Sequence, residues 1–409
     1  MGWTHILIYS FLVLSLAIAQ APQRGPLQQW SVQIQLYVDQ LATNSSDTCG
    51  QTPSTADACP SLQTALNSFA QTHPNISDSM LTVWFAPGNY TQSAITLCGL
   101  NLTLDQTPTT LGAVVISSFL PFVNGDTSFC TLPLTLNIYN LNFVSINNLI
   151  QMDQFAPLDI AIVNTTLQPN PANPGAVAIA IGAPYPGSHV TRISIISSNI
   201  VHFGNGVLIS INPLDLLIDR TVLHMNANQF AMTQLGASSG NIVITNTMVD
   251  GGGGMLAEGT YNVTLANSTF AGLSSADTIF YLTRSTLDIT NCTFGNISSG
   301  LPLIDMDHGQ CAIASSLFSG NMAEQQGLLM LVGTDSCNIS DTTFVSAAGQ
   351  VDIMCIGSVL NTARLNSNQV AQPSITNDKC RINGNGAQSI HPQHTILLLI
   401  ITLLIVLVL

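Results

Sequence analysis

The sequence predicts an all-β protein, a single-stranded parallel β-helix of roughly ten to twelve coils with an N-terminal capping helix. Three observations favour this fold. One short phrase recurs at intervals near 24 residues, the apolar residues of each phrase alternate with period two, and no helical period lies between the phrases. Short strands joined by turns at such intervals wind into a solenoid whose coils stack about 4.8 Å apart.

The repeated phrase has the form Φ-x-Φ-x-[Asn/Ser/Asp]-x-x-Φ, where Φ is apolar. Its last residue, here called the closing residue, falls at Phe143, Leu167, Ile200, Leu223, Val249, Phe270, Phe294, Phe318, Phe344 and, more weakly, Val370. The intervals are therefore 24, 33, 23, 26, 21, 24, 24, 26 and 26 residues. The longest interval is rich in Pro, Ala and Gly, which predicts a loop inserted into one coil over residues 168–190.

A polar residue stands three positions before each closing residue. Asn is the most frequent type, at Asn140, Asn164, Asn246, Asn267 and Asn291; other coils have Ser197, Ser315, Asp341 and Ser367, and Arg220 is the exception. Asn tolerates the left-handed conformation of a tight turn, and its amide can bond to the coils on either side. We therefore expect an asparagine ladder that points inward.

The N-terminal part of the chain predicts a cap, because a terminal coil otherwise exposes its core and its strand edge. Leu62, Ala65, Leu66 and Phe69 lie on one face of a helix expected over 61–71, after a Pro start. We expect this helix to cover a first coil that begins with the strand 81–85. The predicted organisation is a signal peptide at 1–19, an N-terminal segment with the capping helix at 20–80, the β-helix at 81–380 and a lipid-anchor signal at 381–409.

The two terminal segments predict passage through the secretory pathway. An apolar run from Ile6 to Ala17 followed by a small-x-small site is typical of a signal peptide. Near the other end, small residues, a polar spacer and the apolar stretch 395–409 are typical of a glycosylphosphatidylinositol signal, with a short transmembrane helix as the alternative. The lipid attachment candidates are Asn383, Gly384, Asn385 and Gly386. Either arrangement predicts a protein on the extracellular face of the plasma membrane.

Ten N-x-S/T sequons predict glycosylation in a eukaryotic host. Seven are expected acceptors: Asn44, Asn75, Asn89, Asn101, Asn262, Asn296 and Asn338. The other three, Asn164, Asn267 and Asn291, are doubtful because an inward ladder residue could not carry a glycan. Asn262 and Asn338 are expected on the outward side of their strands and should be better acceptors.

Nine cysteines in an oxidising compartment predict disulfides with one thiol left over. Cys311 and Cys337 both stand seven residues before a closing Phe, so they should stack in neighbouring coils. The other candidate pairs are Cys355 with Cys380, Cys49 with Cys59 and, less directly, Cys98 with Cys130; Cys292 is the candidate free thiol.

The charge balance excludes two classes of partner. Charged residues make up 7% of the chain, with 21 acidic residues against 7 basic ones and a net charge of −14. So few basic residues cannot neutralise phosphates, which excludes nucleic acid as a partner, and an anionic surface repels acidic polysaccharides. No cofactor is implied, and cell-surface glycans or proteins are the expected partners.

The segments "CPSLQTALNSFAQ…LTVWFAPGNYTQ", "STLDITNCTFGN" and "SSLFSGN" resemble the right-handed parallel β-helix, or pectin-lyase-like, superfamily. The last segment is similar to the Phe-x-x-Asn repeats of chlamydial polymorphic membrane proteins, although their Gly-Gly-Ala companion motif is missing. The resemblance covers roughly residues 50 to 370 and implies a right-handed solenoid. The motifs of polygalacturonases in this superfamily (Asn-Thr-Asp, Asp-Asp, Gly-His-Gly and Arg-Ile-Lys) are absent in every part.

The strongest catalytic candidate is "LIDMDHG", where Asp305 and Asp307 should point outward from one strand about 6 to 7 Å apart, beside His308. Two carboxylates at this distance could flank a glycosidic bond or share a calcium ion, but solvated surface residues are the simpler interpretation. Two functions stay open: a glycosylated, membrane-anchored protein for display, adhesion or glycan binding without catalysis, or a polysaccharide lyase or glycoside hydrolase. A purely structural wall protein cannot be separated from the first of these by sequence.

Overall fold

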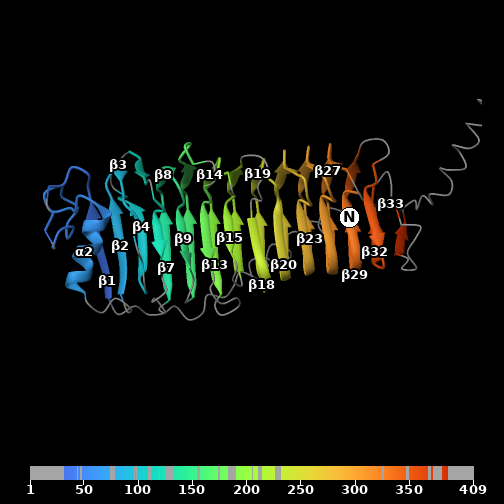
Figure 1. Ribbon diagram of the computed structural model, residues 1–409, viewed down its shortest axis with the longest axis horizontal. Coiled ribbons are helices and arrows are strands. Elements are labelled where there is room, and N and C mark those ends of the chain that lie inside the picture. The colour runs from blue at the N-terminus through green and yellow to red at the C-terminus, as the bar shows by residue number, and fades with distance from the viewer. Residues whose placement is uncertain are drawn as a thin grey trace, which may run out of the picture.

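The computed structural model is an elongated parallel β-helix whose coils follow one another in chain order, with α2 at the N-terminal end (Figure 1). It describes residues 32–385 with these exceptions: 44, 47, 74–78, 96, 98, 109–111, 119, 126–132, 154–156, 174–175, 183–189, 205, 211–213, 226–231, 325–326, 347–349, 367–369 and 372–379. All strand pairings within these residues are parallel, as a single-stranded solenoid requires.

Each complete coil contributes strands to three faces. The first face holds β1 Val32–Val38, β2 Ser79–Phe85, β4 Asn101–Gln106, β7 Leu134–Tyr139, β10 Leu158–Val163, β13 Thr191–Ile196, β16 Leu214–Asp219, β32 Val359–Ala363 and β34 Arg381–Asn385. Five longer strands supply this face with their C-terminal halves and the third face with their N-terminal halves: β18 Met232–Thr245, β20 Met255–Ala266, β23 Phe280–Thr290, β26 Ile304–Ala314 and β29 Leu329–Ser340.

The second face follows the polar turn residues. It consists of β3 Gly88–Thr91, β5 Val114–Ser117, β8 Asn142–Ile146, β11 Thr166–Pro169, β14 Asn199–Val201, β17 Val222–His224, β19 Met248–Asp250, β21 Thr269–Ala271, β24 Thr293–Gly295, β27 Leu317–Ser319 and β30 Thr343–Val345. The remaining strands of the third face are β6 Val123–Gly125, β9 Ile150–Asp153, β12 Ile179–Gly182, β15 Leu208–Ser210, β31 Ile353–Ile356 and β33 Val370–Ala371. The short strands β22 Ser274–Ser275, β25 Ser298–Ser299 and β28 Met322–Ala323 form a separate small sheet.

The predicted repeat fixes the register of the second face. Nine of the ten predicted closing residues, from Phe143 to Phe344, pair in unbroken succession from coil to coil. The last four are phenylalanines whose rings stack at centroid distances of 5.0, 4.6 and 4.6 Å. The assignment of Val370 as the tenth closing residue was wrong. Val370 lies in β33 on the third face and pairs with Ile353, and Arg364 takes the left-handed turn position of that coil at φ 51°.

The asparagine ladder exists, but it points outward. Its members have φ values from 50° to 57°, the left-handed region expected for these turns. Asn164 Nδ2 donates to Asn140 Oδ1 at 2.6 Å, and Asn291 Nδ2 donates to Asn267 Oδ1 at 2.9 Å. All four side chains are exposed. The expectation of an inward ladder was therefore wrong, because the left-handed residue bends the chain at the corner between two faces and its side chain points to solvent.

The inward position is taken instead by the next residue in each coil, which is a hydroxyl residue at nearly every turn. This buried hydroxyl ladder contains Thr165, Ser198, Thr221, Thr247, Ser268, Ser316 and Thr342. Each hydroxyl accepts a backbone N–H from a neighbouring coil or donates to the carbonyl two residues earlier, as Ser316 does at 3.2 Å from Cys292 N and 2.8 Å from Ala314 O. Leu141, Cys292 and Leu365 hold the other described positions of this row, and Cys292 donates to Thr290 O.

The ends of the solenoid differ from the predicted boundaries. β1 lies before α2 in the sequence and pairs with β2 over seven residues, so the stack already includes Val32–Val38 and does not start at residue 81. The helix α2 Leu62–Thr72 was predicted within one residue. Its N-cap is Ser61, and it packs against β1, which precedes the strand 81–85 in the stack. At the other end β34 pairs with β32, so the sheet continues to residue 385 instead of ending at 380.

The predicted insertion at 168–190 is narrower than expected. Within it, β12 pairs with β9 and β15, and Ala176, Ala178 and Ile179 are fully buried. The stretch rich in Pro, Ala and Gly thus contains a regular third-face strand, which its small residues had concealed.

Three of the predicted disulfides are present. They join Cys49 to Cys59, Cys311 to Cys337 and Cys355 to Cys380. Cys311 and Cys337 also pair in register between β26 and β29, as their equal distance from a closing Phe predicted. Cys292 is free, as predicted, and it is buried. Cys98 and Cys130 lie outside the described residues.

Candidate functional site

The acidic pair lies on the third face, in the N-terminal half of β26. Asp305 sits between Tyr281 of β23 and Met330 of β29, while Asp307 sits between Thr283 and Val332. Burial, and to a smaller extent the negative charge of Asp307, raises the pKa of Asp305 to about 6. Its Oδ1 atom is buried without a hydrogen-bond partner. A carboxyl in this environment is partly protonated near neutral pH.

His308 does not complete a catalytic group with Asp305. It occupies the corner after Asp307 with φ 64°, and its Nδ1 lies 2.7 Å from Asp307 Oδ1. Its ring lies over Gly333 of the next coil, where an added Cβ would come within 2.9 Å of Nε2. Arg284 takes the same corner position one coil earlier, yet the described residues show no ion pair between it and either acid. Neighbouring strands supply no third carboxylate at this register.

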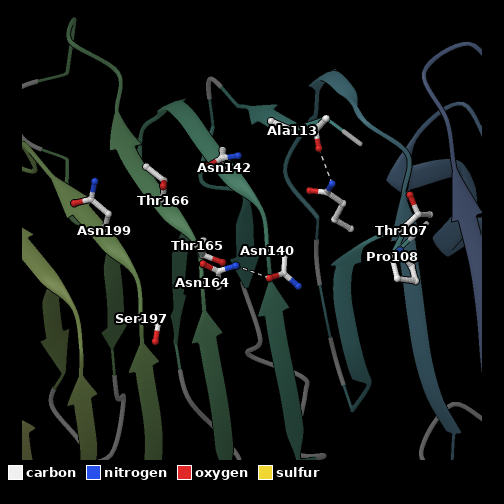
Figure 2. Close-up of a pocket in the computed structure, with 12 residues that line it drawn as sticks. Thr107, Pro108, Ala113, Asn140, Asn142, Asn164, Thr165, Thr166, Ser197 and Asn199 are labelled. Atoms are coloured by element: carbon white, nitrogen blue, oxygen red, sulfur yellow. Dashed lines mark hydrogen bonds between the residues drawn. The ribbon is translucent and has the colours of Figure 1, made fainter. Parts of the chain in front are cut away.

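A polar groove of about 640 Å³ lies elsewhere, at the corner between the first and second faces of the coils built by β4 to β14 (Figure 2). Twelve residues line it: Gln106, Thr107, Pro108, Gly112, Ala113, Asn140, Asn142, Asn164, Thr165, Thr166, Ser197 and Asn199. One wall comes from the segment that follows β4, and the other comes from three successive rungs of the corner. Its volume falls within the range of about 300 to 1,000 Å³ that is typical of ligand pockets.

Two ladders of polar side chains give the groove its chemistry. The first is the outward turn ladder of Asn140, Asn164 and Ser197, and the second is Asn142, Thr166 and Asn199, which pair in register on β8, β11 and β14. The second ladder stops at Val222 in the next coil, and Met248 follows it. Amide and hydroxyl groups therefore line this groove over three coils and then give way to apolar side chains.

The amides are held by a directed chain of hydrogen bonds. Asn164 donates to Asn140, and Asn140 Nδ2 donates in turn to Asp105 Oδ1 at 2.8 Å. Burial raises the pKa of Asp105, although its hydrogen bonds from Asn140 and from the Gln106 backbone oppose the shift. On the opposite wall, Gln106 Nε2 donates to Gly112 O. The chain fixes the orientation of each amide before any ligand arrives, which lowers the entropy that binding would lose.

The groove lacks the features of a catalytic or ionic site. Among the described residues that line it, none carries a charge and none is aromatic. It can offer both hydrogen-bond donors and acceptors to a neutral polar ligand, but it can supply neither a general acid nor a counter-ion. Sequence reasoning found the first ladder and missed the groove; the available signal was the second polar ladder, which begins two residues after the first and runs over three successive coils before Val222 interrupts it.

The sequons differ in how much room they leave for a glycan. Asn101 is 7% exposed on β4, so its placement speaks against the predicted role as an acceptor. Asn44 and Asn75 lie outside the described residues. The side chains of the remaining predicted acceptors are exposed: Asn89, Asn262, Asn296 and Asn338. Exposure of Asn164, Asn267 and Asn291 removes the reason for doubting these three.

The remaining predicted positions bring no further site together. Asn383, Gly384 and Asn385 are lipid attachment candidates that lie in β34, where attachment would end the chain inside a paired strand, and Gly386 lies outside the described residues. Within the described part of the chain, no group of three His, Cys, Asp or Glu side chains could hold a metal ion. Nor is any helix of that part long and apolar enough to cross a bilayer.

Comparison with known proteins supports the fold and is silent on activity. A family model described as a right handed beta helix region matches residues 186–344. The sequence matches no curated protein. The matched segment covers the coils from the end of the inserted loop to the last closing Phe, which is where the phenylalanine stack and the longest strands lie. The chain is thus a right-handed parallel β-helix protein, and its coils fit the pectin-lyase-like superfamily.

Proposed function

We propose that this protein is a secreted, glycosylated and membrane-anchored β-helix that displays a glycan-binding surface without catalysis. The observation that carries the proposal is the groove at the corner of β4 to β14, which is lined by fixed amides and hydroxyls and by no charged group. Sugar hydroxyls both donate and accept hydrogen bonds, so such a lining matches an uncharged oligosaccharide.

The groove also selects against acidic polysaccharides. A polyuronate needs cations to offset its charge, and the lining residues provide none. The chain as a whole carries a net charge of −14, which adds long-range repulsion of a polyanion. We therefore expect neutral glucans, mannans or galactans to bind and pectate to be rejected.

A panel of immobilised oligosaccharides, neutral and acidic, tests this proposal. Wild-type protein produced without N-linked glycans should bind neutral members. Asn142→Ala and Asn199→Ala should each lower the affinity by about tenfold, the effect of losing one good hydrogen bond in a desolvated site. Asn361→Ala is the control, because it also removes an outward amide, one that donates to Asn338 far from the groove. Binding that the control reduces as much as the groove variants would contradict the proposal.

Secretion and anchoring are a separate part of the proposal, supported by the apolar segments 6–17 and 395–409 and by the sequons. Cells that express the full chain should release the protein when treated with a phosphatidylinositol-specific phospholipase. Retention on the cell surface after treatment would favour a transmembrane helix instead.

One observation favours a second candidate function, hydrolysis or elimination of a glycan at the third face. The pKa of Asp305 is raised to about 6, a value that suits a general acid near neutral pH. Reducing-end and unsaturated-product assays on the panel sugars should show no turnover by the wild type. Turnover that Asp305→Asn or Asp307→Asn abolishes would establish this candidate and overturn the non-catalytic proposal.

A further inference from the structure

Asn164 lies in the groove and is also the acceptor residue of the sequon Asn164-Thr165-Thr166, whose three residues all line the groove. Its side chain is exposed and lies between the rungs that carry Asn140 and Ser197 (Figure 2). The acceptor amide of this sequon is therefore surrounded by the same hydrogen-bonding groups that would hold a sugar.

Glycosylation of Asn164 is compatible with the ladder. Its Nδ2 carries two hydrogens, and one of them is donated to Asn140 Oδ1 at 2.6 Å. Attachment of a sugar replaces only one hydrogen, so the modified amide can keep this bond. The bond then fixes the direction in which the first sugar leaves the corner, alongside Asn142, Thr166 and Asn199.

The same ladder supplies comparison sites outside this groove. Asn267 and Asn291 are sequon residues with φ values of 50° and 53°, against 51° for Asn164. Asn291 donates to Asn267 just as Asn164 donates to Asn140. The three acceptors share backbone conformation and exposure, Asn164 and Asn291 also donate the same ladder bond, and of the three only Asn164 lines the groove described above.

We propose that Asn164 carries an N-linked glycan whose first sugars lie in the groove and exclude other neutral glycans from it. The transfer forms a bond between Asn164 Nδ2 and the anomeric carbon of N-acetylglucosamine. A lipid-linked oligosaccharide diphosphate is the donor, the lipid diphosphate leaves, and the amide loses one proton. This inference rests on the proposed secretion and on the proposed glycan binding by the groove.

The test uses full-length protein from a eukaryotic secretory host. A peptide N-glycosidase is added to the folded protein, and release at each site is followed by mass spectrometry. Release from Asn164 should be at least about fivefold slower than from Asn267 and Asn291, because the enzyme must wait for the sugar to leave the groove. After unfolding, all three sites should be released at one rate.

A binding measurement completes the test. Asn164→Gln keeps an amide and removes the glycan, so it should raise binding to immobilised neutral gluco- and manno-oligosaccharides, while Asn267→Gln should leave it unchanged. An empty Asn164 beside occupied Asn267 and Asn291, or equal release rates in the folded protein, would refute the inference alone. Absence of glycan from all exposed sequons would refute both the inference and the proposed secretion.

Discussion

The phenylalanine stack gives the sharpest test of how the coils hold together. Phe318 is buried and stacks on Phe294 and Phe344, each at 4.6 Å, whereas Phe344 is buried and has only one described stacking partner. Replacing a buried Phe with Ala costs about 3 to 5 kcal/mol of unfolding free energy, and a stacked pair contributes about 0.5 to 1.5 kcal/mol beyond burial. Phe318→Ala should therefore destabilise the protein by about 1 kcal/mol more than Phe344→Ala.

Urea unfolding followed by circular dichroism measures this difference. Hydrogen exchange of β24, β27 and β30 is the companion measurement, because a solenoid couples mainly neighbouring coils and need not unfold in one step. Phe318→Ala should increase exchange in both neighbouring strands, and Phe344→Ala should affect β27 more than β24. Equal destabilisation by the two variants, with exchange spread evenly along the solenoid, would refute the idea that stacking adds to burial.

Three further substitutions have expected outcomes. The pKa of Asp305 is about 6 in the folded protein, against 3.8 for an ordinary Asp, so the unfolding free energy should fall as pH rises from 3.8 to about 6. Asp305→Asn should remove this slope and stabilise the protein by about 1 kcal/mol at pH 7, as urea unfolding at a series of pH values would show. Cys292→Ser should change the unfolding free energy from urea unfolding by less than about 0.5 kcal/mol, because hydroxyl side chains occupy most other positions of its row. Rapid alkylation of the thiol in the folded protein would contradict the burial of Cys292. Gly240→Ala should lower the unfolding free energy by at least about 2 kcal/mol, because the added Cβ would lie 2.0 Å from Leu214 O. An unchanged urea midpoint would contradict this close approach.

The fold could be predicted because each coil repeats the same physical requirements. Alternation of buried residues such as Leu136 and Ile138 marks the first face, and the closing residues mark the second. The equal spacing of Cys311 and Cys337 from their closing Phe residues also predicted the disulfide that joins them. These signals are periodic, so a pattern in the sequence carries them directly.

The third face was harder to predict because its strands have no fixed distance from the closing residue. β12 was hidden in a stretch that looked like a loop, and Val370 belonged to this face although it was assigned to the second. The outward direction of Asn267 was missed for a different reason. Period-two alternation does not continue through a left-handed residue, so the side after such a turn cannot be counted from the strand before it.

The groove itself could not be read from the repeat. One of its walls comes from Gln106, Thr107, Pro108, Gly112 and Ala113, which lie before the first repeated phrase. The opposite wall includes Asn142, Thr166 and Asn199, which are 24 and 33 positions apart in the sequence. They lie side by side because they pair in register on successive coils. Only the stacking of coils brings such residues to one place.

Calorimetric titration of a neutral oligosaccharide selected from the panel, into protein that lacks the Asn164 glycan, tests the central claim most directly. Binding should be unchanged between about 50 and 500 mM NaCl, because no charged group lines the groove, and it should be lost in the double variant Asn142→Ala/Asn199→Ala. Binding that weakens steeply with salt, or that the double variant retains in full, would contradict the claim that this groove holds an uncharged glycan.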